Sequence, residues 1–103
     1  MTTTPTSLDR TLHAIADPTR RQILRALKQR GAPSPNAPLH GKNGLCAGDI
    51  EECVRLSQPT ISHHMAILTK AGLVDAVKQG QWRWYRRNEK ALRQVVKSLR
   101  TQL

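Results

Sequence analysis

The sequence predicts a mostly α-helical fold with one small β-hairpin, in the order helix, helix, helix, helix, hairpin, helix. Apolar residues recur at helical spacing in five segments, whereas the stretch VDAVKQGQWRWYRRN has two extended runs around a glycine. The length of 103 residues, 38% of them hydrophobic, suits one small core and no second domain. Because the chain has two Trp, one Tyr and no Phe, this core is expected to be mostly aliphatic.

The first two predicted helices are separated by an Asp-Pro pair. The first spans about residues 8–16 and has three apolar side chains on one face, Leu8, Leu12 and Ile15. Asp17 precedes Pro18 and therefore avoids the helical region, which ends this helix. Asp17 can then cap a second helix with proline at its first position. That helix is expected to reach about Gln29 and to bury Ile23, Leu24 and Leu27.

Two segments are predicted to lie outside the regular elements. Residues 1–6 are polar and are expected to form a disordered tail, so that the domain spans residues 7–103. Residues 31–45, GAPSPNAPLHGKNGL, contain three prolines and three glycines. We expect them to form a long exposed loop, because this composition breaks both helices and strands.

The third and fourth helices are predicted to form a helix–turn–helix unit. The third spans about residues 47–55, with Ile50, Cys53 and Val54 facing inward. A tight turn then leads to Ser57, which is suited to cap a fourth helix over about residues 58–71. Gly72 is expected to end that helix. Its apolar side chains share one face: Ile61, Met65 and Leu68.

The C-terminal part is predicted to be a hairpin followed by one more helix. Gln79-Gly80-Gln81 separates two extended runs, as expected for a hairpin with glycine at its turn. Asn88 is suited to cap a helix over residues 89–102. Apolar residues of this helix recur at i, i+3, i+4 and i+7, at Leu92, Val95, Val96 and Leu99.

The charge distribution favours a polyanionic partner. The net charge is +10, and residues 56–103 contribute +7 of it against +3 from residues 1–55. A basic surface that merely keeps the protein in solution is the alternative. The fourth helix has hydrogen-bonding side chains opposite its apolar face and no acid, which suits the major groove of DNA. The predicted DNA-binding residues are Ser57, Gln58, Thr60, Ser62, His63, His64 and Lys70, and in the hairpin Lys78, Gln79, Gln81 and Arg83.

Other function classes are less consistent with the sequence. No catalytic motif, paired carboxylates or phosphate-binding loop is present, so we predict that the chain is not an enzyme. It has no membrane span and no signal peptide, which with two cysteines predicts a cytoplasmic protein. Trp82 and Trp84 could stack on bases of a non-specifically bound single strand, but we expect them to pack against the helices. Tyr85 is expected in the core.

Three segments carry a family resemblance: HAIADPTRRQILRAL (13–27), LSQPTISHHMAILTKAGLV (56–74) and GQWRWYRRNEKAL (80–92). They resemble the ArsR/SmtB family of bacterial winged helix-turn-helix repressors, and the likeness excludes only the N-terminal tail and the 31–45 loop. This resemblance implies a homodimer that binds a palindromic operator in double-stranded DNA until an inducer releases it. The dimer would form through the first and last helices, with interface residues Leu8, Leu12, Leu92, Val95, Val96 and Leu99.

The family's effector sites are only partly matched. Its metalloid-sensing branch begins the third helix with Cys-Val-Cys-Asp-Leu-Cys; here Cys46 matches the first cysteine, but Gly48 and Glu51 replace the other two. Cys53 lies about 10.5 Å further along a continuous helix, which is too far for a disulfide, and too far for a shared ion unless Cys46 lies before the helix and folds back. The last helix lacks the ligands of the zinc- and nickel-sensing branches. A metal or metalloid ion, a thiol switch at Cys46 and Cys53, and the absence of an effector site all remain open.

Overall fold

The computed structural model describes residues 7–31 and 44–103, and its elements match the predicted order with two additions. The predicted tail and most of the predicted loop lie outside the described residues. The two additions are a π-helical turn, η1, and a short strand, β1. The elements are α1 (Ser7–Ala16), α2 (Pro18–Ala26), η1 (Leu27–Gly31), β1 (Leu45–Cys46), α3 (Ala47–Val54), α4 (Gln58–Lys70), β2 (Val74–Gln79), β3 (Trp82–Arg87) and α5 (Glu89–Gln102).

Two predicted helix caps are confirmed. The Asp17 carboxylate accepts hydrogen bonds from the backbone N–H groups of Thr19 (2.7 Å) and Arg20 (3.1 Å) at the start of α2. The Asn88 side chain accepts one from the N–H of Ala91 (3.0 Å) at the start of α5. Each cap satisfies donors that the first turn of a helix leaves without a partner. These side chains therefore fix where α2 and α5 begin.

Glycine sets the geometry on both sides of strand β2. Gly72 has a φ of 79°, and the N–H of Leu73 reaches back to the carbonyl of Leu68 (3.1 Å), which ends α4 in a Schellman-type turn. Gly80 has a φ of 61° at the first position of the two-residue turn between β2 and β3. A left-handed residue there matches the twist of the two strands. Both predicted glycine positions are confirmed.

The sheet has three strands, not the two of the predicted hairpin. Its order is β1-β3-β2, all antiparallel, and Leu45 of β1 pairs with Tyr85 of β3. The prediction that the loop extends through residue 45 was therefore wrong. Two residues are too few to show a strand periodicity, but the buried Leu45 side chain gives the segment a reason to dock on the sheet.

The second helix ends earlier than predicted. Regular α2 geometry stops at Ala26, and the chain continues as the wider η1 turn. Leu27 nevertheless remains buried, so the predicted inward face of the helix is kept. A change of helix type that leaves the same residues inward cannot be seen in a hydrophobic pattern.

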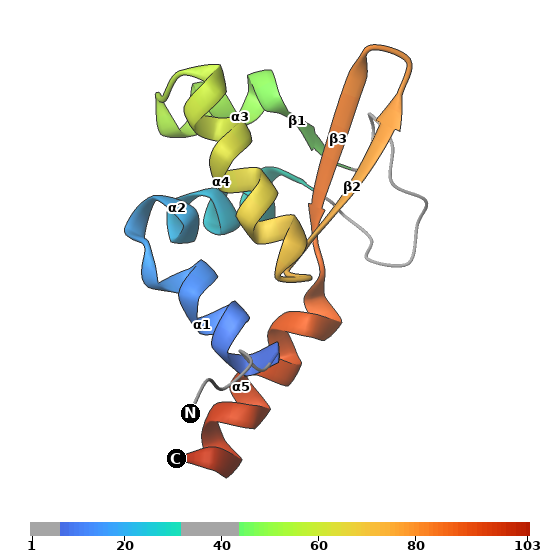
Figure 1. The fold of residues 1–103 in the computed structure, drawn as a ribbon. Helices are drawn as coiled ribbons and strands as arrows, with labels where there is room; N and C mark the ends of the chain where they lie inside the picture. The colour runs from blue at the N-terminus through green and yellow to red at the C-terminus, as the bar shows by residue number, and fades with distance from the viewer. Residues whose placement is uncertain (1–6, 32–43) are drawn as a thin grey trace, which may run out of the picture.

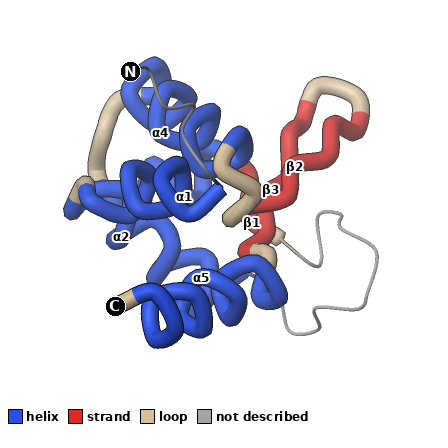
Figure 2. Tube along the Cα trace, turned by 60° about the horizontal axis from the view of Figure 1, so that its bottom comes forward, coloured by secondary structure: helices blue, strands red, loops and turns tan. Residues whose placement is uncertain are grey.

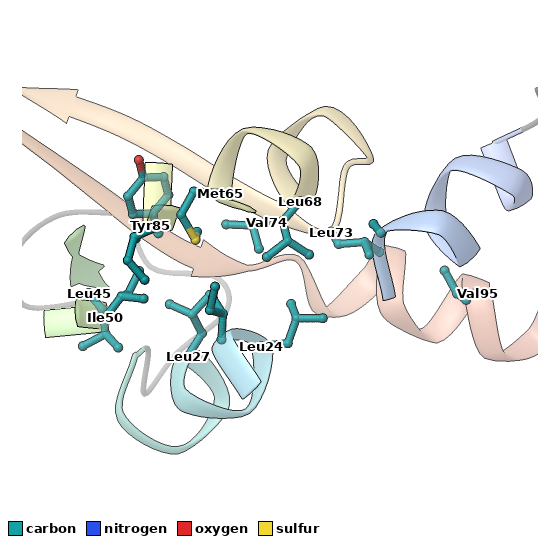
Figure 3. Close-up of a cluster of buried hydrophobic side chains, with 13 residues drawn as sticks. Leu24, Leu27, Leu45, Ile50, Met65, Leu68, Leu73, Val74, Tyr85 and Val95 are labelled. Carbon is teal, nitrogen blue, oxygen red and sulfur yellow. The ribbon is translucent and has the colours of Figure 1, made fainter. Parts of the chain in front are cut away.

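Figure 3 shows the aliphatic core, which lies where the helices meet the base of the sheet. Ile61, Met65 and Leu68 of α4 are fully buried there, as predicted. Helix α1 was predicted to have Leu8, Leu12 and Ile15 on one face. Thr11 and Ala14 are the buried residues of that helix, whereas Leu12 is 37% exposed. The apolar face of α1 is thus divided between the core and the surface.

The remaining elements lie at opposite ends of the molecule. α1 and α5 lie together at the end that holds the C-terminus, and the β2–β3 hairpin projects from the other side (Figure 1). Figure 2 shows the same hairpin extending beyond the helices. No helix in the described parts of the chain is both long and apolar enough to cross a membrane.

The backbone conformation of Arg55 indicates that a substitution there can increase stability. Arg55 is exposed and has a φ of 55° at the end of α3, a left-handed conformation that costs a non-glycine residue about 1–2 kcal/mol. Replacing Arg55 with Gly removes this cost but adds chain entropy to the unfolded state. We expect a net gain of about 0.5–1 kcal/mol, measured by urea unfolding. Glu52→Gly, within the regular turns of α3, should lose about 1 kcal/mol; equal losses in both variants would contradict the prediction.

Candidate nucleic-acid interface

Helix α4 presents a polar surface because its fully buried apolar residues share one face. Ile61, Met65 and Leu68 are buried, and their spacing of four and three residues places them on one face. The side chains of Gln58, Ser62 and His63 are exposed, and Thr60 is half-buried. No acid occurs between Leu56 and Gly72. The surface can thus donate and accept hydrogen bonds without repelling phosphates.

The start of α4 differs from the prediction in one contact. Ser57 stands at the capping position, but its hydroxyl lies 2.9 Å from the Thr60 hydroxyl and makes no capping bond to the backbone. The predicted side-chain cap was therefore wrong. Because it makes no capping bond, the Ser57 side chain does not cover the first-turn N–H groups, where the helix dipole is positive. Such a helix start can bind an anionic oxygen.

The two adjacent histidines of α4 lie in different environments. His63 is exposed, whereas His64 is half-buried with its Nδ1 atom 3.3 Å from Nη1 of Arg20 on α2. Burial lowers the pKa of His64, with Arg20 and His63 acting in the same direction and Asp17 opposing them. His63 and His64 therefore cannot be treated as one pair of ligands.

The hairpin adds a second exposed polar surface. Lys78 and Arg83 are cross-strand partners, and both are exposed, as are Gln79 and Gln81 near the turn. Side chains on directly opposed strand positions lie close together, so the two cations act on the same region. The hairpin thus offers positive charge beyond the reach of α4.

The aromatic residues of β3 correct one prediction and confirm another. Tyr85 is buried in the core, as expected. Trp82 was expected to pack against the helices but is 60% exposed, and Trp84 is half-buried with its ring centroid 6.4 Å from that of Trp82. Trp82 and Trp84 lie on the face of β3 opposite Tyr85, because side chains alternate along a strand. This face is turned away from the helices.

The structure brings some predicted residues together and separates others. Gln58 and Lys70 lie at opposite ends of α4, about 18 Å apart along the helix axis. Lys70 instead lines a groove with Asp9, Arg10 and His13 of α1. A duplex could therefore contact the polar start of α4 and the hairpin without also contacting Lys70.

Arg20 is the site residue that the sequence analysis missed. It is only 7% exposed and lies beside His64. A signal was present, because Arg20, Ile23, Leu24 and Leu27 have the i, i+3, i+4, i+7 spacing of one helix face. A cation on that apolar face indicates a specific partner inside the fold.

The cysteines lie at the two ends of α3. The Cys46 thiol is 3.2 Å from an Asp49 carboxylate oxygen, which also accepts a hydrogen bond from the Cys46 N–H. Cys53 was expected to face inward, but it is only half-buried and borders a surface groove with Arg25 and Arg55. Within residues 7–31 and 44–103, no three His, Cys, Asp or Glu side chains are grouped to hold a metal ion. His40 lies outside the described residues.

Comparisons with known proteins agree with this arrangement. A family model described as a helix-turn-helix domain matches residues 15–77. The transcriptional repressor SdpR of Bacillus subtilis is 36% identical over 81% of this chain and 78% of its own length. The arsenical resistance operon repressor of Staphylococcus xylosus is 33% identical over 85% of this chain and 72% of its own length.

A solved structure shows the same fold. It is the homodimeric winged helix-turn-helix DNA-binding domain of a possible ArsR-family regulator from Mycobacterium bovis, with a TM-score of 0.67 and 23% identity. The likeness covers 92% of this chain and 77% of that one. The predicted winged helix-turn-helix fold is confirmed, and so is the prediction of a non-enzymatic regulator, since these relatives are transcription regulators. The chain belongs to the ArsR family of winged helix-turn-helix transcriptional regulators and is a DNA-binding regulator of transcription.

Proposed function

We propose that the chain is a cytoplasmic homodimeric repressor that reads a palindromic operator and is released by an effector. The observation that supports base reading is the orientation of α4, which buries its apolar residues and exposes Gln58, Ser62 and His63. A Gln amide can form two hydrogen bonds to adenine, and the hydroxyl and imidazole groups can contact bases or phosphates. The hairpin would contact the neighbouring backbone as the wing. Residues 7–103 would form this one domain.

The proposed dimer would form through α1 and α5. Val96 is 59% exposed, and Leu12 is also exposed, although both are apolar and each lies on one of these neighbouring helices. Leu8, Leu92 and Leu99 are half-buried and can be covered further by a partner. Val95 is already buried in the core, so it would contribute little new area. The homodimeric state of the Mycobacterium bovis relative supports this proposal.

A two-fold dimer makes a geometric demand on the operator. Its two α4 helices must enter successive major grooves on one side of the duplex, about 34 Å apart. Selection of bound duplexes from a random pool tests this requirement. We expect an inverted repeat with half-sites about one helical turn apart. Enrichment without a shared sequence, or of a single half-site, would contradict the proposal.

A single-strand binder is the second candidate, because the exposed Trp82 beside Trp84 could stack on unpaired bases. The two candidates differ in which competitor displaces the protein. If the selected duplex is the ligand, single strands of the same sequence should compete poorly. A Trp82→Ala variant that loses single-strand binding while wild-type protein prefers single strands would instead favour this second candidate.

Arg83 predicts a change in salt dependence. Its exposed guanidinium on the hairpin is placed for a phosphate contact, and each such contact releases counterions from the DNA. Replacing Arg83 with Ala should make the slope of log affinity against log salt shallower by about one unit. Arg93→Ala on α5 removes the same charge away from the hairpin and should leave the slope unchanged. Equal slopes for Arg83→Ala and wild type would place Arg83 outside the interface.

A further inference from the structure

Arg20 is a buried cation whose main partners are backbone carbonyls. Its Nε donates to the carbonyl of Ala14 (2.6 Å), and its Nη2 donates to the carbonyl of His13 (3.1 Å). Both carbonyls belong to the last turn of α1, where the helix dipole is negative. The nearest carboxylate, that of Asp17, is 3.9 Å from Nη1. Arg20 therefore joins the end of α1 to the start of α2.

The same guanidinium also constrains a side chain of α4. Nη1 of Arg20 lies 3.3 Å from Nδ1 of His64. Arginine remains protonated in proteins and can only donate, so Nδ1 must offer its lone pair. A neutral imidazole then has its proton on Nε2, at the opposite edge of the ring. The half-buried His64 side chain retains exposed surface, so Nε2–H is the donor that the ring can offer to an acceptor outside the fold.

Burial favours this neutral ring, whereas the charges around His64 act on it in both directions. The charged and titratable groups that act on it are Arg20 and Asp17 of α2 and His63 of α4 itself. A proton added to Nδ1 would remove the acceptor and place a second cation beside Arg20. Burial, the largest cause, lowers the pKa of His64; Asp17, the next largest, raises it, and Arg20 and His63 lower it further. The folded state thus disfavours the imidazolium ion.

We propose that Arg20 is a positioning residue for DNA recognition, which holds His64 as the Nε2–H tautomer so that the ring presents a neutral donor to the DNA. This inference rests on the proposed function, because it needs α4 to read a duplex. It assigns different tasks to the neighbouring histidines: His63 has an exposed side chain, whereas His64 is held in one protonation state. It also ties the position of α1, and hence of a proposed dimer helix, to a base-reading side chain.

The first test is the ring nitrogen NMR spectrum of His64 in the DNA-free protein at about pH 7.5. We expect an unprotonated Nδ1 and a protonated Nε2. Arg20→Met, which keeps an apolar stem but no donor, should mix the two tautomers if it folds. A proton on Nδ1 in the wild-type protein would overturn the proposal without any reference to DNA.

The second test uses two replacements of His64 that retain different parts of the ring. The Gln amide nitrogen reaches the position of Nε2, whereas the Asn amide reaches only that of Nδ1. His64→Gln should keep most of the preference for the selected operator over random duplex, and His64→Asn should lower it about tenfold. Equal behaviour of the two variants, or the reverse order, would overturn the proposal. A wild-type protein with no preference for any duplex would instead refute the proposed function.

The direction in which operator affinity changes with pH is an independent test of the protonation state of His64. Because the His64 ring is proposed to be neutral in the complex, a protonated His64 must lose its proton when the protein binds the operator. Lowering the pH from about 7.5 to about 5.5 should therefore weaken wild-type binding relative to His64→Gln. A histidine that binds phosphate as a cation predicts the opposite trend. Wild-type binding that strengthens relative to His64→Gln in acid would overturn the assignment.

Discussion

Replacing Val96 with Asp is expected to separate the proposed dimer and to lower operator affinity about 100- to 10,000-fold. Val96 is 59% exposed in the single chain, so the substitution should leave the fold of each chain intact. In a dimer, however, the new carboxylate would be buried against apolar side chains of the partner without a counter-charge. Each chain would then bind a half-site alone and lose the gain that comes from linking two sites. Sedimentation or light scattering measures the first effect, and titration of the operator measures the second.

The matched control is Thr101→Asp on the same helix. Thr101 is exposed and lies about 140° around α5 from Val96, beside the cationic residues Lys97 and Arg100. The Thr101→Asp substitution adds the same charge to α5 away from the proposed interface, so the dimer should persist. If Val96→Asp remains dimeric at the concentrations at which wild type is dimeric, the interface must lie elsewhere. Unfolding of both variants at one denaturant concentration would show that the loss is not one of folding.

Replacing Gln58 with Ala is expected to remove sequence preference more than affinity for DNA in general. The exposed Gln58 amide is the group on α4 best suited to two simultaneous hydrogen bonds with a base. Its loss should cost about 1–3 kcal/mol per half-site on the selected operator, which is about 5- to 150-fold. Random duplex is held mainly through phosphates, so its affinity should change little. Competition titrations with both duplexes at one salt concentration measure the ratio.

Thr69→Ala is the control for this prediction. Thr69 is exposed on the same helix but lies near its far end, next to Lys70, so neither DNA should bind differently. If Gln58→Ala weakens operator and random duplex equally, Gln58 contacts only the backbone. In that case the sequence preference would have to come from His63, Ser62 or the hairpin.

Most of the helical framework could be predicted from the sequence because it depends on local rules. The side chains of Asp17 and Asn88 cap helices by accepting hydrogen bonds from backbone N–H groups only two or three residues away. Gly72 ends α4 because its own backbone can adopt a left-handed conformation. The apolar face of α4 follows from helical periodicity alone. Such features need no knowledge of the rest of the fold, and they also oriented the candidate DNA-binding surface.

The features that could not be predicted depend on contacts between distant segments. Strand β1 exists because Leu45 docks beside Tyr85, forty residues later. Trp82 is exposed because it lies on the face of β3 opposite the buried Tyr85, and composition alone does not show which face of the hairpin the helices cover. The link between Arg20 and His64 spans 44 residues, and only the face shared with Ile23 and Leu24 hinted at it. Long-range placement, not local propensity, thus decides the details of the site.

The most direct measurement of base reading by α4 combines protein and DNA substitutions. Each purine of the selected operator is replaced in turn by its 7-deaza analogue, which lacks the N7 acceptor of the major groove. At one position in each half-site, this change should weaken wild-type binding about tenfold and Gln58→Ala binding hardly at all. Equal losses in the two proteins at every position, and likewise for His63→Ala, would show that the exposed face of α4 does not touch the bases.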